Sequence, residues 1–298
     1  MHHATPLEKP RTRGMTLTAA QFARAAALEE AQLRVRRLQR MSDRELRALL
    51  EGDPAQAALW VNSAAEYGIA AAQLRLGRML LGGRGVPRDE RVALAWFIRA
   101  ADQGSAEAMN MIGRCHENGW GVPIDLAAAA AHYRTSAARG HAWGEYNFAN
   151  MLFDGRGIAR DVPQALRWYL RAARRGHGRA MNLIGRCLEE GWGCRSSLSA
   201  AIEWYRRSAE TGYFRGQLNY ALALAENGLG ACAAEWFCRA AEGGDEAIRR
   251  FIVCGLARSA DPALAGVAAR IAEMWRPQTS ALNPSHAASE RALRSPHR

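Results

Sequence analysis

Lysine is almost absent from this chain: 39 of its 40 basic residues are arginine, and Lys9 is the exception. The formal net charge is nevertheless +11 over 298 residues, which favours an acidic partner, whether protein, lipid headgroup or nucleic acid. The arginines are scattered, apart from short clusters at 34–37 and 174–175. This scatter weakens the case for nucleic acid, because a phosphate backbone is bound by a continuous basic patch.

Long apolar runs and export signals are missing as well. No stretch reaches the roughly 18–20 uncharged apolar residues that a membrane-spanning helix needs. The N-terminal residues are polar and basic, and the alanine-rich stretch behind them is interrupted by Arg24 and Glu29. A secretory signal does not tolerate such charges. We therefore expect a soluble, cytoplasmic protein without a membrane span, starting at Met1 or Met15.

Motifs of catalysis are lacking too. The chain has no C-x-x-C pair, no G-x-S-x-G elbow, no phosphate loop followed by Lys and no dinucleotide fingerprint. It also shows no paired acid and base or activated nucleophile. The sequence therefore predicts no enzyme activity and no cofactor.

What the chain does contain is an internal repeat of 36 residues, defined by three markers. The first is two small residues followed, after two more, by glycine; it ends at Gly68, Gly104, Gly140, Gly176, Gly212 and, after a shorter step, Gly244. The second is a G-x-G turn beginning at Gly83, Gly119, Gly155 and Gly191. The third is a pair of ring side chains at 96–97, 132–133, 168–169, 204–205 and 236–237. Markers in fixed phase indicate tandem structural units.

Each unit is predicted to form two helices. In residues 105–117, for example, apolar side chains such as Ala108, Ile112 and Cys115 recur at helical spacing. The G-x-G turn ends this helix, because glycine adopts left-handed backbone readily. The second helix runs through the ring pair and ends at the next marker glycine. Its expected N-caps are Asp89, Asp125, Asp161 and Ser197. One helix pair cannot bury its apolar face alone, so the units must stack.

The predicted organisation has a solenoid at its centre. Ser42 and Glu45 form a capping box that opens a degenerate first unit. The segments are a disordered basic N-terminus 1–16; an amphipathic helix 17–41; a solenoid 42–275, made of the degenerate unit 42–68, full units 69–104, 105–140, 141–176 and 177–212, a shortened unit 213–244 and a cap 245–275; and a disordered tail 276–298. The tryptophans within helices are expected in the core: Trp60, Trp96, Trp168, Trp204 and Trp236. Cys115 and Cys187 lie two units apart, beyond the ~7 Å Cα separation of a disulfide, and are expected to be buried free thiols.

The repeat pattern strongly resembles the Sel-one-like repeat, a relative of the tetratricopeptide repeat, over roughly residues 55–244. One unit carries it in Ala106, Ala108, Ile112, Gly113, Gly119, Gly121, Val122, Asp125, Tyr133 and Gly140. Departures are mild: His132 stands where Trp is typical, Ala149 and Ala221 where Gly is typical, and Ser197 replaces Asp. The resemblance implies an all-α, right-handed α-α superhelix that serves as an adaptor or scaffold in bacterial protein complexes. It implies no activity, because function in such folds depends on the exposed positions.

A second period of 72 residues points to candidate binding residues, since 108–121 and 180–193 are nearly identical. On the first helices, Asn110 with Arg114 and Asn182 with Arg186 form i,i+4 pairs, and Arg78 holds the same phase. Such a ladder on the concave face would bind the carboxylates of an acidic or C-terminal peptide. The alternative is that these arginines pair with nearby glutamates such as Glu117 and Glu189.

The G-x-G turns form a second candidate surface. Their middle residues alternate as Arg84, Trp120, Arg156 and Trp192. Exposed Trp and Arg are enriched in binding hot spots. The alternative is that each Trp packs on a neighbouring turn, stacked on Arg84 or Arg156.

Histidines invite a metal hypothesis that spacing opposes. His141 and His177 are equivalent residues of successive units, about 10 Å apart in stacked helix pairs. One shared ion allows ~4 Å or less. We expect no metal site.

The sequence therefore predicts a non-enzymatic scaffold that binds a partner polypeptide along its concave face and turn rim. The alternative is a solenoid that binds nucleic acid or another polyanion. Residues 17–40 are a candidate for self-association or for docking on the first unit.

Overall fold

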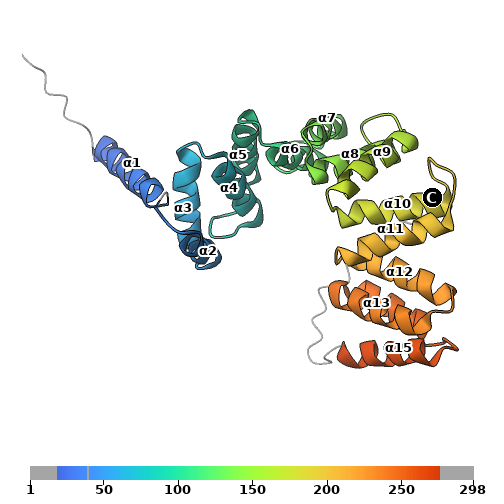
Figure 1. Ribbon diagram of the computed structural model, residues 1–298. Helices are drawn as coiled ribbons and strands as arrows, with labels where there is room; N and C mark the ends of the chain where they lie inside the picture. Colours follow the sequence, from blue (N-terminus) through green and yellow to red (C-terminus); the bar gives the residue numbers. More distant parts are fainter. Residues whose placement is uncertain (1–18, 39, 276–298) are drawn as a thin grey trace, which may run out of the picture. The chain divides into compact units, whose positions relative to one another are not determined.

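The computed structural model of the chain describes residues 19–38 and 40–275, and within these ranges it contains helices and no β-strand (Figure 1). The helices are α1 (Ala19–Leu38), α2 (Asp43–Glu51), α3 (Pro54–Glu66), α4 (Ala70–Gly82), α5 (Glu90–Asp102), α6 (Ala106–Asn118), α7 (Leu126–Ala138), α8 (Ala142–Asp154), α9 (Val162–Arg174), α10 (Gly178–Glu190), α11 (Leu198–Glu210), α12 (Phe214–Glu226), α13 (Gly230–Gly243), α14 (Glu246–Leu256) and α15 (Pro262–Met274). The predicted all-α repeat fold is confirmed. The disorder expected for 1–16 and 276–298 lies outside the described residues.

The helices group into two compact units, one ending at Trp168 and the other beginning at Tyr169, so that the division falls inside α9. In the first unit, α3 to α8 pack on one another in chain order, and α1 and α2 rest on α3. In the second unit, α10 to α13 pack in the same consecutive way, and α15 covers α13 (Figure 1). Stacking of neighbours in sequence is the packing of a solenoid.

Each helix begins and ends where local chemistry dictates. Ser105 caps α6 by accepting from the backbone N–H of Ala108 at 3.2 Å, and Asp125 caps α7 through Ala128 at 2.9 Å. The other expected caps of second helices also form, at Asp89, Asp161 and Ser197. The predicted capping box between Ser42 and Glu45 opens α2. Each such cap stabilises its helix by about 1 kcal/mol.

The two glycines of the G-x-G turn serve different purposes. Gly119 ends α6 in left-handed backbone, with φ of 75°. Gly121 also has positive φ, and a Cβ there would stand 2.5 Å from the backbone oxygen of Glu90. Because Glu90 begins α5, the second glycine lets each turn lie directly against the preceding unit. The repeat therefore needs glycine at the second position for packing as well as for conformation.

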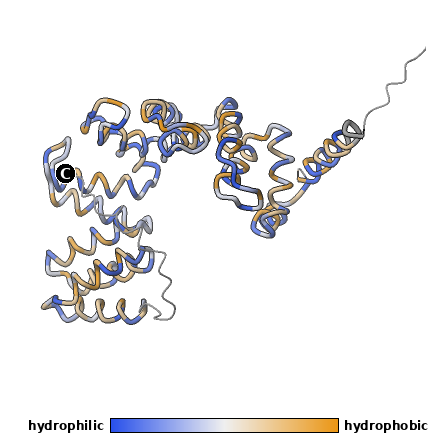
Figure 2. Tube along the Cα trace, turned by 180° about the vertical axis from the view of Figure 1, so that it is seen from behind, coloured by the Kyte–Doolittle hydropathy of each residue, from blue (hydrophilic) through white to orange (hydrophobic). Residues whose placement is uncertain are grey.

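The core is a small residue on each first helix facing a ring on the second. A Cβ at Gly113 would lie 2.7 Å from the ring of Tyr133, and one at Gly185 would lie 2.5 Å from the ring of Tyr205. Both tyrosines are buried, and Phe97 fills the same role against Gly77. Figure 2 shows the matching alternation of hydrophobic and hydrophilic residues along the helices.

The tryptophans are less buried than the sequence suggested. Trp96 is buried, but Trp60, Trp168, Trp204 and Trp236 are only partly so. Adjacent residues of a helix point about 100° apart, so the second ring of each pair takes the core. The indole then lies at the edge, where Arg99, Arg207 and Arg239 stack on Trp96, Trp204 and Trp236 at 4.5, 5.0 and 4.7 Å.

Cys115 and Cys187 are buried free thiols, as predicted. Burial raises the pKa of Cys115 to about 11 and that of Cys187 to about 12. Because the thiolate is the reactive form, both groups act as small apolar core residues.

Candidate partner-binding site

The two sets of predicted binding residues meet in the structure. The guanidinium of Arg114 lies over the ring of Trp120, 5.0 Å from its centroid, and Arg186 lies over Trp192 at 5.1 Å. The ladder arginines and the turn tryptophans are therefore one surface. The stacking partners suggested by the sequence, Arg84 and Arg156, are not the ones used.

Local geometry explains this pairing. Arg114 and Arg186 are exposed and lie near the ends of α6 and α10, one residue before a cysteine. The chain then reverses at the left-handed glycine, and the N–H of Trp120 donates to the carbonyl of Cys115 at 3.0 Å. The indole is thereby folded back over the helix that has just ended. A cation over an indole contributes about 0.5–1 kcal/mol at such exposed sites.

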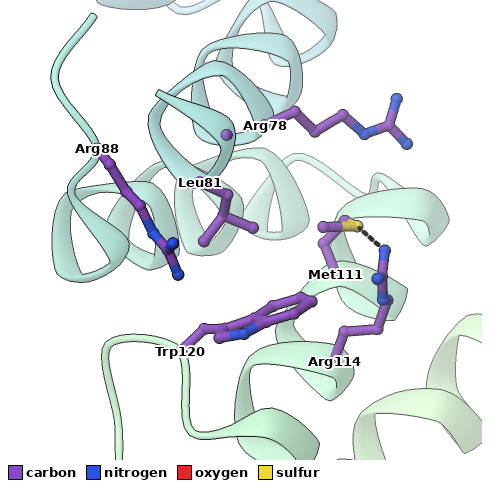
Figure 3. Close-up of a pocket in the computed structure, with 7 residues that line it drawn as sticks. Arg78, Leu81, Arg88, Met111, Arg114 and Trp120 are labelled. Carbon is purple, nitrogen blue, oxygen red and sulfur yellow. Dashed lines mark hydrogen bonds between the residues drawn. The ribbon is translucent and has the colours of Figure 1, made fainter. Parts of the chain in front are cut away.

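A pocket of about 390 Å³ adjoins the first of these stacks, between α4, α6 and their turns (Figure 3). Its floor is the indole of Trp120, with Leu81 and Met111 above it, and guanidiniums surround it. The lining residues are Arg78, Leu81, Gly82, Arg88, Met111, Arg114 and Trp120. The volume is within the range of small-ligand sites, about 300–1,000 Å³.

The three arginines of the pocket differ in their partners. Arg78 forms an ion pair with Glu107, and Arg88 forms one with Glu90. Arg114 has no carboxylate partner among the described residues; its Nη1 lies 3.8 Å from the sulfur of Met111. The residue that occupies the phase of Glu107 in the next unit is Trp143, so no equivalent carboxylate is supplied.

The asparagines of the predicted ladder face inward. Asn110 and Asn182 are each 5% exposed. The side-chain oxygen of Asn110 accepts from the amide of Asn147 at 2.8 Å, and that of Asn182 accepts from Asn219 at the same distance. These bonds join the first helices of consecutive units, α6 to α8 and α10 to α12. Asn110 and Asn182 therefore hold neighbouring first helices together.

The remaining rim residues also differ from one another. Arg84 is exposed. Arg156 donates to Glu117 at 2.8 Å, and the opposite oxygen of Glu117 accepts from the hydroxyl of Tyr133 at 2.5 Å. Burial and this bond to a carboxylate raise the pKa of Tyr133 far above its usual value. Glu117 thus belongs to a structural network rather than to the Arg ladder.

The histidines considered for metal binding are helix caps. Nδ1 of His141 accepts from the N–H of Gly144 at 3.2 Å, and Nδ1 of His177 accepts from Ala180 at 3.3 Å. Within the described ranges, no group of three or more His, Cys, Asp or Glu side chains is placed to hold a metal ion.

Some residues of the site escaped the sequence analysis. Asn147 and Asn219 stand 72 residues apart, so the same period that exposed Asn110 and Asn182 pointed to them. Leu81, Arg88 and Glu107 carry no such signal, because they do not recur at equivalent positions. Only the packing of α4 on the next unit brings them beside Arg114 and Trp120.

This architecture defines a class, the solenoid of short helix-turn-helix repeats. Five stretches match the Sel1 repeat, at residues 70–105, 106–141, 144–177, 178–213 and 233–245, and the chain belongs to the Sel1 repeat family. A comparison with curated protein sequences gave no match.

Solved structures support this assignment. The chain is similar to c5321, a protective antigen present in uropathogenic Escherichia coli strains that displays an SLR fold, with 29% identity, a TM-score of 0.59 and coverage of 76% of this chain. It spans only about half, 51%, of the length of that protein. It is also similar to a Sel1 repeat protein from Oxalobacter formigenes, with 26% identity, a TM-score of 0.60 and coverage of 74% of this chain and 98% of the other.

Of the described helices, none combines the length and the apolar character that crossing a membrane requires.

Proposed function

We propose that this protein is a non-enzymatic scaffold that binds a segment of a partner polypeptide along its first helices and G-x-G turns. The observation that carries the proposal is the duplicated stack of arginine on tryptophan, Arg114 on Trp120 and Arg186 on Trp192. Both side-chain types are enriched where binding energy concentrates. Neither stack is required by the hydrophobic core, whose rings come from the second helices.

The arrangement of the first helices supports the choice of face. α6 contacts α8 directly, and α10 contacts α12, in addition to their contacts with second helices. First helices that approach one another form the inner side of a stack, which is the side that solenoids use for extended ligands. A cytoplasmic setting, in which the cysteines stay reduced, is part of the proposal.

The test is affinity capture with two matched triple variants. We expect Arg78→Ala/Arg114→Ala/Arg186→Ala to lose most of the partner recovered by the unmodified protein, because the cations of the first helices are removed. The control is Arg99→Ala/Arg207→Ala/Arg239→Ala, which removes the same charge and the same kind of Trp stack from second helices. Equal recovery by the two triple variants would refute this binding face.

A further inference from the structure

The pocket between α4 and α6 has two chemically different halves. Leu81, Met111 and the face of Trp120 form an apolar half, while Arg78, Arg88 and Arg114 form a cationic rim (Figure 3). A ligand that uses both halves carries an anionic group within a few bonds of an apolar side chain. A lone anion would leave the apolar half in contact with water.

The charge balance specifies how much negative charge the rim accepts. Glu107 neutralises Arg78, and Glu90 neutralises Arg88. One positive charge therefore remains, on Arg114. A monoanion compensates it, whereas a phosphate dianion would require one of the internal ion pairs to open.

Arg114 is also held in an orientation suited to a carboxylate. Stacking on Trp120 uses the flat face of the guanidinium, and the N–H donors lie in the plane at its edge. The donor fork therefore remains available for two parallel hydrogen bonds to one carboxylate. Because the ring restrains the side chain beforehand, less conformational entropy is lost on binding.

From these features we infer that the pocket binds the C-terminal residue of a partner polypeptide, with the α-carboxylate on Arg114 and an apolar terminal side chain over Trp120. In such a residue the carboxylate and the side chain branch from one carbon atom, which matches the adjacency of the two halves. An internal Asp or Glu has no apolar group so close to its carboxylate. The inference rests on the proposed function and names the part of the partner that this site recognises.

The pocket is specific to one place in the chain. The Arg–Trp stack recurs 72 residues later at Arg186 and Trp192, but Asn150 stands at the position equivalent to Arg78. Arg186→Ala is therefore a matched control, since it breaks an identical stack outside the pocket.

The experiment titrates the full chain with N-acetyl-leucine, N-acetyl-leucinamide and inorganic phosphate. The readout is the indole N–H resonance of Trp120 in ¹⁵N-labelled protein, assigned with Trp120→Phe. We expect saturable shifts with N-acetyl-leucine and binding weaker by about tenfold or more with the amide and with phosphate, because a charged hydrogen bond or an apolar contact is lost. Arg114→Ala and Arg114→Gln should weaken N-acetyl-leucine binding by a similar factor, while Arg186→Ala should leave it unchanged. Circular dichroism checks that each variant is folded.

Equal binding of the acid and the amide, equal binding of phosphate, or undiminished binding by both Arg114 variants would overturn the inference. These results are separable from the test of the proposed function. If the triple variant of the first helices loses the partner while N-acetyl-leucine does not bind, the scaffold role stands and the C-terminal pocket is wrong. If N-acetyl-leucine binds as expected while the triple variant retains the partner, the pocket stands and the general binding face is wrong.

Discussion

At the residue scale, the fold depends on contacts between a helix backbone and a ring. Gly113 and Gly185 leave room for Tyr133 and Tyr205, whose hydroxyls reach Glu117 and Glu189 at 2.5 and 2.6 Å. Glycine in a helix costs about 1 kcal/mol relative to alanine. The closer approach of the two helices compensates for this cost by burying a complete aromatic ring.

Adding one methyl group at this contact should therefore destabilise the protein. We expect Gly113→Ala to lower the free energy of unfolding by about 1–3 kcal/mol, because the new Cβ overlaps the Tyr133 ring in a packed core. The measurement is urea or thermal unfolding followed by circular dichroism. Gly266→Ala is the control: Gly266 lies in α15 with nothing within 4 Å of an added Cβ, so alanine should stabilise by up to ~1 kcal/mol. A neutral or stabilising effect of Gly113→Ala would contradict this account.

At the element scale, two histidines couple helix packing to pH. His132, in place of the Trp typical of the repeat, stacks on His116 with ring centroids 5.5 Å apart and an interplanar angle of 9°. Burial, and then the charge of His116, lower the pKa of His132. Burial is also the main cause that lowers the pKa of His141, whose unprotonated Nδ1 caps α8.

These shifts predict acid sensitivity. Because both folded-state pKa values lie below that of an unfolded histidine, about 6.5, the neutral rings contribute stability that is fully present above that pH. The contribution is lost as the pH falls through the folded-state values. We expect the melting temperature to fall between about pH 7 and pH 5, and to fall less in His132→Phe/His141→Asn, which keeps a ring and a capping side chain without titrating. The same fall in both proteins would show that other groups cause the acid sensitivity.

At the scale of the whole molecule, net charge gives a poor account of the surface. The chain carries +11, yet many arginines are already engaged. Some pair with glutamates, such as Arg206 with Glu203, and others lie on tryptophan rings. Phosphate binding requires guanidiniums that can leave such partners together along one path.

We therefore expect weak, salt-sensitive binding of nucleic acid. Any complex with duplex DNA or single-stranded RNA in a gel-shift titration at low salt should disappear by about 150 mM salt, because affinity falls steeply as salt rises when few phosphates are contacted strongly. A discrete complex that persists at that salt concentration would favour the polyanion-binding alternative over the scaffold.

Most of the fold was predictable because the repeat determines it locally. The turn glycines, the caps such as Asp125 and the small residues facing rings recur at one period, and each specifies a helix end or a helix contact. The tryptophans were overestimated as core residues, because periodicity places two adjacent rings on a helix without indicating which one faces its neighbour. Packing against Gly113 and its equivalents assigns that place to the second ring.

The candidate site was predictable only in its members. Arg78, Arg114, Trp120 and their equivalents stood out by phase, and nothing in the spacing paired Arg114 with Trp120 instead of with a neighbouring turn. That pairing depends on the direction in which the chain leaves the left-handed Gly119.

By itself, the sequence determined an all-helical stack of Sel1 repeats, since caps, glycines and apolar spacing act over a few residues. Tertiary structure decided that Asn110 is an internal bond between helices, that Glu107 occupies Arg78, and that Arg114 is left over Trp120 without a carboxylate partner in the described chain. The physical reason is that these contacts join residues about 30 or more positions apart. Their geometry is set by how one helix pair rests on the next.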